Sequence, residues 1–433
     1  MMLNKNIHRH FVLSLCLISC LSALAQPSDK ILSKEQLMTF PEKMGSIYYA
    51  YPGPQDKALG DAPKGYTPFY ISHYGRHGSR FQPNDARYKD VLDIFEAEYL
   101  KGNLTELGED VMSRLHKLWV IARGNGGQLS EVGAQQHREI ARRMYARFPE
   151  VFSQGKSIEA RSSVVPRCKA SMEAFCASLD NEIKQNPAKA NVSGITQETK
   201  QEFMEYIAYD SPEQKQLDKD TKLWRGEWEK YEKEQVKGER LCKTLFKEIK
   251  DIDQYKVAIG LYWLAEGMQD IPTDLTLIEL FTPEELYNIW TTINYRMYVC
   301  NADAPIANGV GIACAKNLLR NIIEKADAAV KGNEECATLR FGHDSHLIRL
   351  LSLMKVEGCG TQESDLRNLH NVWQDFYISP MAANLQMIFY RNKSGKVIVK
   401  FLHNENEVSL PIRCENGKYY RWKDVKKYLS NML

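Results

Sequence analysis

Residues 68–80 read PFYISHYGRHGSR, and this stretch decides how the rest of the chain is interpreted. The apolar residues 69–71 predict a β-strand, because aromatic and β-branched side chains favour strands. The strand runs into a polar, glycine-flanked cluster in which Arg76 and Arg80 bracket His77. In an open α/β sheet, ligands bind where strands end in this way. The stretch therefore predicts a binding site at the end of a strand.

The residue types in this cluster favour phosphate chemistry. An arginine stays charged and presents a planar fork that matches phosphate oxygens. A histidine held between fixed cations is kept neutral, and a neutral imidazole is a nucleophile or a base. The cluster thus predicts attack by His77 on a phosphorus atom whose oxygens Arg76 and Arg80 hold. The alternative is a surface loop with scattered charge.

A second strand ends in reactive residues at 336–349, CATLRFGHDSHLIR. Residues 337–341 predict a strand, Gly342 ends it, and Ser345 is expected to cap a helix over 347–354. The functional interpretation is that Asp344 protonates a leaving oxygen while His343 helps to hold the phosphate. Two alternatives remain, a metal site of His343, Asp344 and His346 and a structural His–Asp pair.

The two clusters together resemble the histidine acid phosphatases, the second branch of the histidine phosphatase superfamily. Residues 76–80 are similar to the RHGxRxP signature of that family, although Gln82 stands where the family has proline, and Pro83 follows it. His343 and Asp344 are similar to its His-Asp motif. The branch that contains multiple inositol polyphosphate phosphatases usually has His-Ala-Glu there, so the acid is expected at Asp344.

Two further segments carry the resemblance. Residues 129–148 predict a helix with Ser130 as its N-cap, and they are similar to the family's Leu-Thr-x-x-Gly-x-x-Gln helix. Residues 161–175 are similar to the family block R-S-x-x-x-x-R-x-x-x-S-x-x-A-F, which supplies another phosphate-binding arginine. Arg161 is the first choice for that role and Arg167 is the second. Without coordinates the two cannot be separated.

The resemblance implies an α/β fold, a twisted mixed sheet flanked by helices with an inserted α-helical cap domain. The Lys/Glu/Gln-rich middle of the chain has the spacing of amphipathic helices and suits such a cap. The expected organisation is a signal peptide at 1–25, the first part of the α/β core at 26–179, the cap at 180–310 and the second part of the core at 311–433.

The first 25 residues predict export. Lys5 and Arg9 precede an apolar run that is too short to span a bilayer, and residues 23–25, Ala-Leu-Ala, fit a cleavage site. The competing interpretation is a lipoprotein signal with a lipid anchor at Cys20. Either one places the protein in the periplasm or outside the cell. An even number of cysteines, eight, follows the signal, which permits disulfides in an exported protein.

The resemblance implies the activity of a phosphoric monoester hydrolase. His77 would form a phosphohistidine, Arg76, Arg80, Arg161 or Arg167 and His343 would bind phosphate, and Asp344 would be the proton donor. No cofactor and no metal is expected, because arginines take the place of Mg²⁺. The partner is a small phosphorylated substrate, such as phytate or another inositol polyphosphate; the alternatives are a sugar phosphatase similar to glucose-1-phosphatases and a broad acid phosphatase. The net charge of +2 gives no argument for nucleic acid, and no later run predicts a membrane span. A phosphoryl mutase and a non-catalytic phosphate binder are the remaining classes.

Overall fold

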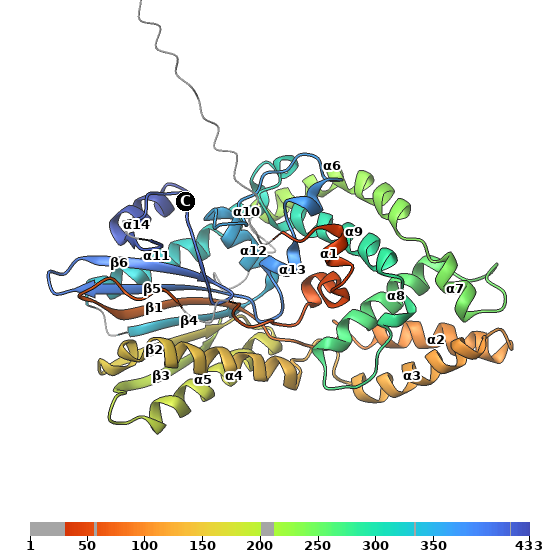
Figure 1. Ribbon diagram of the computed structural model, residues 1–433, viewed down its shortest axis with the longest axis horizontal. Coiled ribbons are helices and arrows are strands. Elements are labelled where there is room, and N and C mark those ends of the chain that lie inside the picture. Colours follow the sequence, from red (N-terminus) through yellow and green to blue (C-terminus); the bar gives the residue numbers. More distant parts are fainter. Residues whose placement is uncertain (1–30, 56–58, 201–211, 333–334, 416) are drawn as a thin grey trace, which may run out of the picture.

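The structure is a computed structural model, and it describes residues 31–55, 59–200, 212–332, 335–415 and 417–433 (Figure 1). Within these residues, eight strands form one sheet with the order β3-β2-β4-β1-β5-β6-β7, and β8 pairs with β6. Strands β3, β2, β4 and β1 are parallel, whereas β5 to β8 pair antiparallel. The strands are β1 (Tyr66–Arg76), β2 (Lys156–Ser162), β3 (Val192–Thr199), β4 (Glu335–Gly342), β5 (Asn384–Asn392), β6 (Val397–His403), β7 (Asn406–Val408) and β8 (Tyr420–Arg421). The predicted mixed α/β sheet is confirmed.

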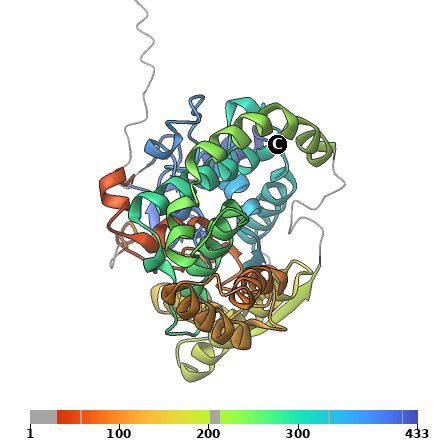
Figure 2. The same cartoon turned by 90° about the vertical axis from the view of Figure 1, so that its right-hand side faces the viewer.

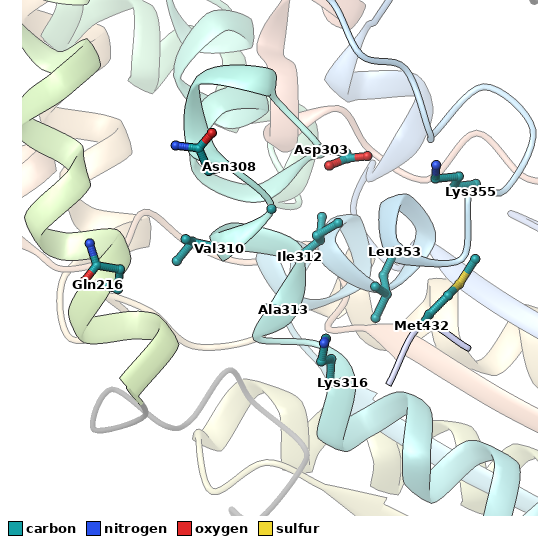
Figure 3. Close-up of a pocket in the computed structure, with 11 residues that line it drawn as sticks. Gln216, Asp303, Asn308, Val310, Ile312, Ala313, Lys316, Leu353, Lys355 and Met432 are labelled. Atoms are coloured by element: carbon teal, nitrogen blue, oxygen red, sulfur yellow. The ribbon is translucent and has the colours of Figure 1, made fainter. Parts of the chain in front are cut away.

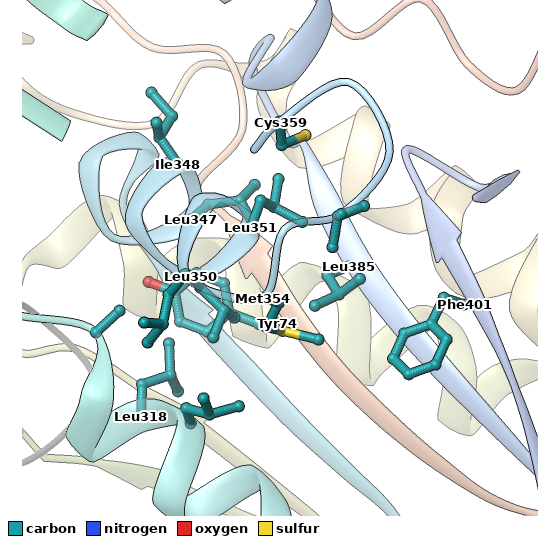
Figure 4. Packing of buried hydrophobic residues seen from close by; sticks show 14 of the residues in the cluster. Tyr74, Leu318, Leu347, Ile348, Leu350, Leu351, Met354, Cys359, Leu385 and Phe401 are labelled. Carbon is teal, nitrogen blue, oxygen red and sulfur yellow. The ribbon is translucent and has the colours of Figure 1, made fainter. Parts of the chain in front are cut away.

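Helices cover both faces of the sheet, as Figure 1 shows. One face packs against α11 (Lys316–Val330), α12 (Asp344–Leu353) and α14 (Trp422–Ser430), and the other packs against α4 (Glu131–Arg147) and α5 (Pro166–Gln185). Figure 4 shows the hydrophobic packing on the first of these faces, where leucines of α12 contact Tyr74 of β1 and Leu385 of β5. Because both faces are covered, the central strands are buried along most of their length, and even their polar residues, such as Ser72, Arg340 and Gln386, are buried.

A second hydrophobic core lies beyond the sheet, in the helical part at the right of Figure 1. Figure 2 looks onto this part and shows the helices stacked in front of the sheet. Most of this core comes from α2 (Ala86–Leu100), α3 (Glu106–Ala122), α7 (Glu239–Leu245), α8 (Gln254–Gly267) and α9 (Pro283–Asn301). The remaining helices of the described chain are α1 (Lys34–Leu37), α6 (Pro212–Gln235), α10 (Val310–Ala313), α13 (Asp375–Ile378) and the short turns η1 (Pro41–Tyr48), η2 (Pro149–Ser153), η5 (Met268–Asp270), η6 (Ile278–Leu280), η7 (Pro305–Ala307) and η8 (Leu369–Asn371).

The middle of the chain departs from the predicted boundaries in two ways. Strand β3 pairs with β2 in the sheet, although it lies inside the range 180–310 that we expected to be helical. As an edge strand it is largely exposed, and its sequence VSGITQET is mostly small and polar and lacks a run of apolar residues. Helices α2 and α3 pack in the second core, although they precede residue 179.

The helix after β4 also begins earlier than predicted. We expected Ser345 to cap a helix over 347–354, but α12 starts at Asp344 and His343 is its N-cap residue. The carboxylate of Asp344 accepts a hydrogen bond from the backbone N–H of Ser345 at 2.6 Å. An acidic residue in the first turn interacts favourably with the helix dipole, which explains the earlier start.

The predicted signal peptide, with Cys20, lies outside the described residues. Among the described helices, none has the length and apolar character that crossing a membrane requires. The disulfides permitted by the cysteine count do not form: no disulfide joins the cysteines from Cys168 to Cys414, all of which are described. Five of these thiols are buried, and several pack in the hydrophobic cores as small apolar groups do.

Candidate active site

The site forms where the neighbouring parallel strands β1 and β4 end. Arg76, the last residue of β1, pairs in register with Gly342, the last residue of β4. The residues that follow, His77 and His343, therefore come together, with ring centroids 5.8 Å apart in an edge-to-face arrangement. The backbone N–H of His77 donates to the carbonyl oxygen of Gly342 at 2.9 Å. Sheet pairing thus joins two sequence motifs that lie far apart in the chain.

His77 is buried, and its surroundings keep it neutral. Its Nδ1 lies 2.9 Å from the carbonyl oxygen of Gly78, which can only accept, so Nδ1 carries the proton. Burial, followed by the positive charges of Arg167, Arg76 and Arg80, holds the pKa of His77 well below its usual value. Nε2 therefore keeps its lone pair at neutral pH, as a nucleophile requires.

Arg76 is fully buried and is fixed by main-chain oxygens. Its Nη1 donates to the carbonyl oxygens of Ile47 and Ser379, each at 2.7 Å. Its Nη2 lies 3.1 Å from Oδ2 of Asp344. Three segments from different parts of the chain thus set the plane of this guanidinium group.

Arg80 is held by Tyr48, a residue of η1. The Nη1 of Arg80 donates to the Tyr48 hydroxyl at 3.1 Å and to the carbonyl oxygen of Phe81 at 2.7 Å. The guanidinium carbon lies 4.9 Å from the centroid of the Tyr48 ring, which adds a cation–π contact. The Nε of Arg80 and the Nε of Arg167 are buried and have no partner within the described residues. Buried N–H donors of this kind can be satisfied by the oxygens of a bound anion.

The structure separates the two candidate arginines that the sequence could not distinguish. Arg161 lies in β2, where its Nη2 is 3.0 Å from Glu198 and 3.5 Å from Glu159. Arg167 lies in the first turn of α5, and after burial it is the largest cause of the lowered pKa of His77. The structure favours our second choice, Arg167, over our first, Arg161: carboxylates match the charge of Arg161 within the sheet, whereas Arg167 lies beside His77.

His343 and Asp344 complete the group. The Nε2 of His343 lies 3.2 Å from the hydroxyl oxygen of Ser163 and 3.7 Å from the sulfur of Cys168. Burial alone would raise the pKa of Asp344, but Arg76 and His343 outweigh it, so this pKa lies below its usual value. Without a ligand, Asp344 is therefore a carboxylate. A bound phosphate dianion would raise its pKa, because like charges disfavour ionisation.

We call Arg76, His77, Arg80, Arg167, His343 and Asp344 the cradle. The loop that carries its first three members is packed tightly against α4. A Cβ atom on Gly78 would lie only 2.5 Å from the carbonyl oxygen of Gly133, so any larger residue would displace this loop. His346 packs on Tyr74, with ring centroids 5.8 Å apart, and among the described residues no group of three His, Cys, Asp or Glu side chains could hold a metal ion.

A buried carboxyl group lies beneath this loop. The Ser79 hydroxyl donates to Oδ1 of Asp270 at 2.5 Å and accepts from Nε2 of Gln136 at 2.8 Å. Burial raises the pKa of Asp270 to about 8, although Ser79, Arg80 and Arg76 oppose that rise. Sequence reasoning missed Asp270 and Tyr48, because neither lies in a motif or at the end of a strand.

A cavity of about 450 Å³ adjoins the cradle at Arg80 and Tyr48. We call it the side cavity. Its other walls come from α2, α6, α8 and α9, and its lining residues are Ile47, Tyr48, Arg80, Gln82, Pro83, Arg87, Trp228, Glu232, Tyr255, Ile259, Trp263, Ile293, Arg296, Met297, Cys300 and Asn301. A larger hollow of about 820 Å³ lies beside α10 and the end of α12 (Figure 3). The described residues that line this hollow include none of the cradle.

The chain matches a known family in sequence and known structures in fold. The model of the histidine phosphatase superfamily (branch 2) matches residues 75–404. The structure is similar to that of multiple inositol polyphosphate phosphatase from Bifidobacterium longum, crystallised with inositol hexasulfate, with a TM-score of 0.75 and 20% identity over 89% of this chain and 97% of that one. It is also similar to the phytase from D. castellii, with a TM-score of 0.64 and 13% identity over 95% and 88% of the two chains.

At these identities the structural likeness shows the fold alone. No curated protein sequence matches the chain at a significant level. The family match covers most of the chain, including both motifs at the ends of β1 and β4. The chain therefore belongs to branch 2 of the histidine phosphatase superfamily and is a phosphoric monoester hydrolase.

Proposed function

We propose that the enzyme hydrolyses phosphomonoesters through a phosphohistidine at His77. The observation that carries this proposal is the neutral, buried imidazole, whose Nε2 lone pair lies among Arg76, Arg80 and Arg167. Catalysis of phosphoryl transfer consists mostly of positioning and of stabilising charge on the equatorial oxygens. Three guanidinium groups and His343 are suited to both tasks.

The reaction takes two steps. In the first, Nε2 of His77 forms a bond to phosphorus while the bond from phosphorus to the ester oxygen breaks, and Asp344 gives its proton to that oxygen. In the second, Asp344 accepts a proton from water, the water oxygen attacks phosphorus, and the bond from nitrogen to phosphorus breaks. Inorganic phosphate leaves, and His77 and Asp344 return to their starting states.

Asp344 must bind a proton before the first step. It lies 3.1 Å from Arg76, which favours the carboxylate in the empty site. The charge of an arriving phosphate dianion offsets that of Arg76 and raises the pKa of the carboxyl group. Substrate and proton therefore bind together, and an acidic pH favours turnover.

We propose inositol polyphosphates, including phytate, as the substrate class, with sugar phosphates as the alternative. The side cavity, of about 450 Å³, is large enough for a six-membered ring, and Arg87 and Arg296 in its lining are suited to bind further phosphates. The expected signal in residues 1–25 suits an exported enzyme that acts in the periplasm or outside the cell.

The test is the release of phosphate from p-nitrophenyl phosphate, inositol hexakisphosphate and glucose 1-phosphate, with the His77→Ala variant in parallel. We expect turnover by the parent enzyme, acid-stopped protein that carries phosphate on His77, and a loss on the order of 10⁴-fold or more in the variant. The variant should still bind vanadate, because the arginines remain. Turnover near the parent rate by His77→Ala would refute the proposed nucleophile.

A further inference from the structure

The side cavity contains a carboxyl group that the phosphatase reaction does not need. Glu232, on α6, is half buried and is the only acidic side chain among the described lining residues. The other charged groups in the lining are Arg80, Arg87 and Arg296. A carboxylate in a cavity that accepts phosphorylated rings would repel any phosphoryl group placed near it. Its presence therefore limits which substituents the cavity accepts at that wall.

The partners of Glu232 leave its oxygens able to bind a ligand. Within the described residues, no lysine or arginine forms an ion pair with it. The hydroxyl group of Tyr255, from α8, lies beside its carboxyl group, and Arg296, from α9, is the nearby positive charge. Burial raises the pKa of Glu232, and Tyr255 and Arg296 only partly oppose that rise. In the empty cavity, Tyr255 and Arg296 therefore offset only part of the cost of burying the charge of the Glu232 carboxylate.

The wall around Glu232 has the character of a site that binds polyhydroxylated rings. Trp228 and Trp263 line the cavity, and Tyr48 packs against Trp263 with ring centroids 5.2 Å apart. The guanidinium carbon of Arg296 lies 5.7 Å from the centroid of the Trp228 ring, so a cation–π contact positions this arginine in the same wall. Aromatic faces supply apolar area for the C–H surface of a ring, and carboxylates accept hydrogen bonds from hydroxyl groups.

We propose that Glu232 determines substrate specificity by accepting a hydrogen bond from a free hydroxyl group of the leaving group. The preferred substrate is then a partly phosphorylated cyclitol or sugar. Its scissile phosphate lies in the cradle, a hydroxyl group faces Glu232, and any second phosphate lies toward Arg87 or Arg296. A ring that is phosphorylated at every position places a phosphate against the carboxylate and binds less well. This inference rests on the proposed phosphomonoesterase function of the cradle.

The test compares two substrates in one variant. Glu232→Gln removes the charge but keeps the size and a hydrogen-bonding oxygen. We expect the ratio of kcat/KM for inositol hexakisphosphate to kcat/KM for inositol monophosphate to rise about tenfold, because one like-charge repulsion is lost. Turnover of p-nitrophenyl phosphate, which has no hydroxyl group for Glu232, should change less than about twofold. A Glu232 with a merely structural role would alter all three substrates alike.

Two further variants make the result specific. Glu227→Gln is the matched control, because Glu227 lies on the same helix, is exposed and pairs with Lys230 at 2.7 Å. It should leave the ratio unchanged. Arg296→Gln should move the ratio in the opposite direction, since it removes positive charge from the same wall.

An unchanged or lowered ratio in an active Glu232→Gln enzyme would overturn this inference and leave the proposed function intact. If the parent enzyme failed to release phosphate even from p-nitrophenyl phosphate, both would fall. The p-nitrophenyl phosphate assay therefore distinguishes the two failures.

Discussion

The cradle and the side cavity meet at Arg80, yet they are built in different ways. In the cradle, Arg76 and Arg80 are buried and donate to main-chain oxygens, as Arg76 does to Ile47 and Ser379. In the side cavity, four helices supply most of the lining, and most of the side chains that they contribute are aromatic or apolar. The cradle is suited to one reaction, whereas the cavity walls can vary without disturbing it. The difference separates the chemistry of this enzyme from its choice of substrate.

The largest expected effect tests whether chemistry is confined to the cradle. Asp344→Asn keeps the size of the side chain but cannot deliver a proton. We expect a loss of about 10²- to 10⁴-fold on alkyl phosphates, and a much smaller loss on p-nitrophenyl phosphate, whose leaving group is stable as an anion. Single-turnover phosphorylation rates measure both. Equal losses on the two substrates would mean that Asp344 positions groups in the cradle and that another acid donates the proton.

The parent enzyme should also lose activity as the pH rises, because Asp344 must bind a proton before phosphoryl transfer. The pKa of Asp344 is lowered in the empty site, so kcat/KM for alkyl phosphates should fall as the pH rises from acidic values. This limb of the pH profile should be absent in Asp344→Asn. A limb that persists unchanged in the variant would assign it to a different group.

The next prediction compares an arginine of the cradle with one that lies outside it. Arg167→Lys should lower kcat/KM about 10²-fold, since a point charge does not reproduce the planar fork beside His77. Arg161→Lys is the matched control, because it makes the same exchange at a residue paired with Glu198, and it should stay within about threefold of the parent rate. The reverse order of the two losses would restore Arg161 as the phosphate ligand.

A smaller effect is expected where the cradle meets the cavity. Tyr48→Phe keeps the ring under Arg80 but removes the hydroxyl group that accepts from its Nη1. The loss of one such hydrogen bond should lower kcat/KM about three- to tenfold on every substrate. An effect confined to inositol phosphates would instead assign the Tyr48 hydroxyl to recognition of the leaving group.

The smallest effect concerns stability, and it comes from the carboxyl group beneath the cradle. The pKa of Asp270 is about 8 in the folded protein, against 3.8 as the ordinary value. Between these values the folded state binds the additional proton, so the free energy of unfolding falls as the pH rises. The buried histidines, whose pKa values are lowered by burial, act in the opposite direction only below about pH 6.5.

The effect of Asp270 on the free energy of unfolding is therefore best measured between pH 6.5 and 8, where the buried histidines no longer oppose it. Between these pH values the free energy of unfolding should decline by roughly 1 to 2 kcal/mol less in Asp270→Asn than in the parent protein. Glu266, whose pKa burial also raises, should preserve part of the slope. Urea titrations at several pH values measure the effect, with the exposed Asp274 changed to Asn as the control. An identical slope in parent and Asp270→Asn would mean that Asp270 is ionised throughout.

The same contrast explains what the sequence could predict. Five of the six cradle residues lie directly at the ends of two strands, so local strand signals and residue chemistry locate them without coordinates. Arg167 could not be separated from Arg161, because which of two arginines six residues apart faces His77 depends on where β2 ends and α5 begins. The side-cavity residues come from several helices and from the loop around Arg80, and in the sequence an inward Glu232 looks the same as an outward Glu227.

Strand β1 is the central feature of this molecule, and its pairing has a consequence for the timing of activity. Both of its partners, β4 and β5, come from the last third of the chain. Contacts between residues so distant in sequence form slowly, and during synthesis they have to wait until the C-terminal strands exist. A nascent chain that lacks these strands therefore carries His77 without His343, without Asp344 and without the sheet partners that bury it. The site is therefore assembled only after the strands β4 and β5 have been made, so a nascent chain that ends before them has an incomplete site.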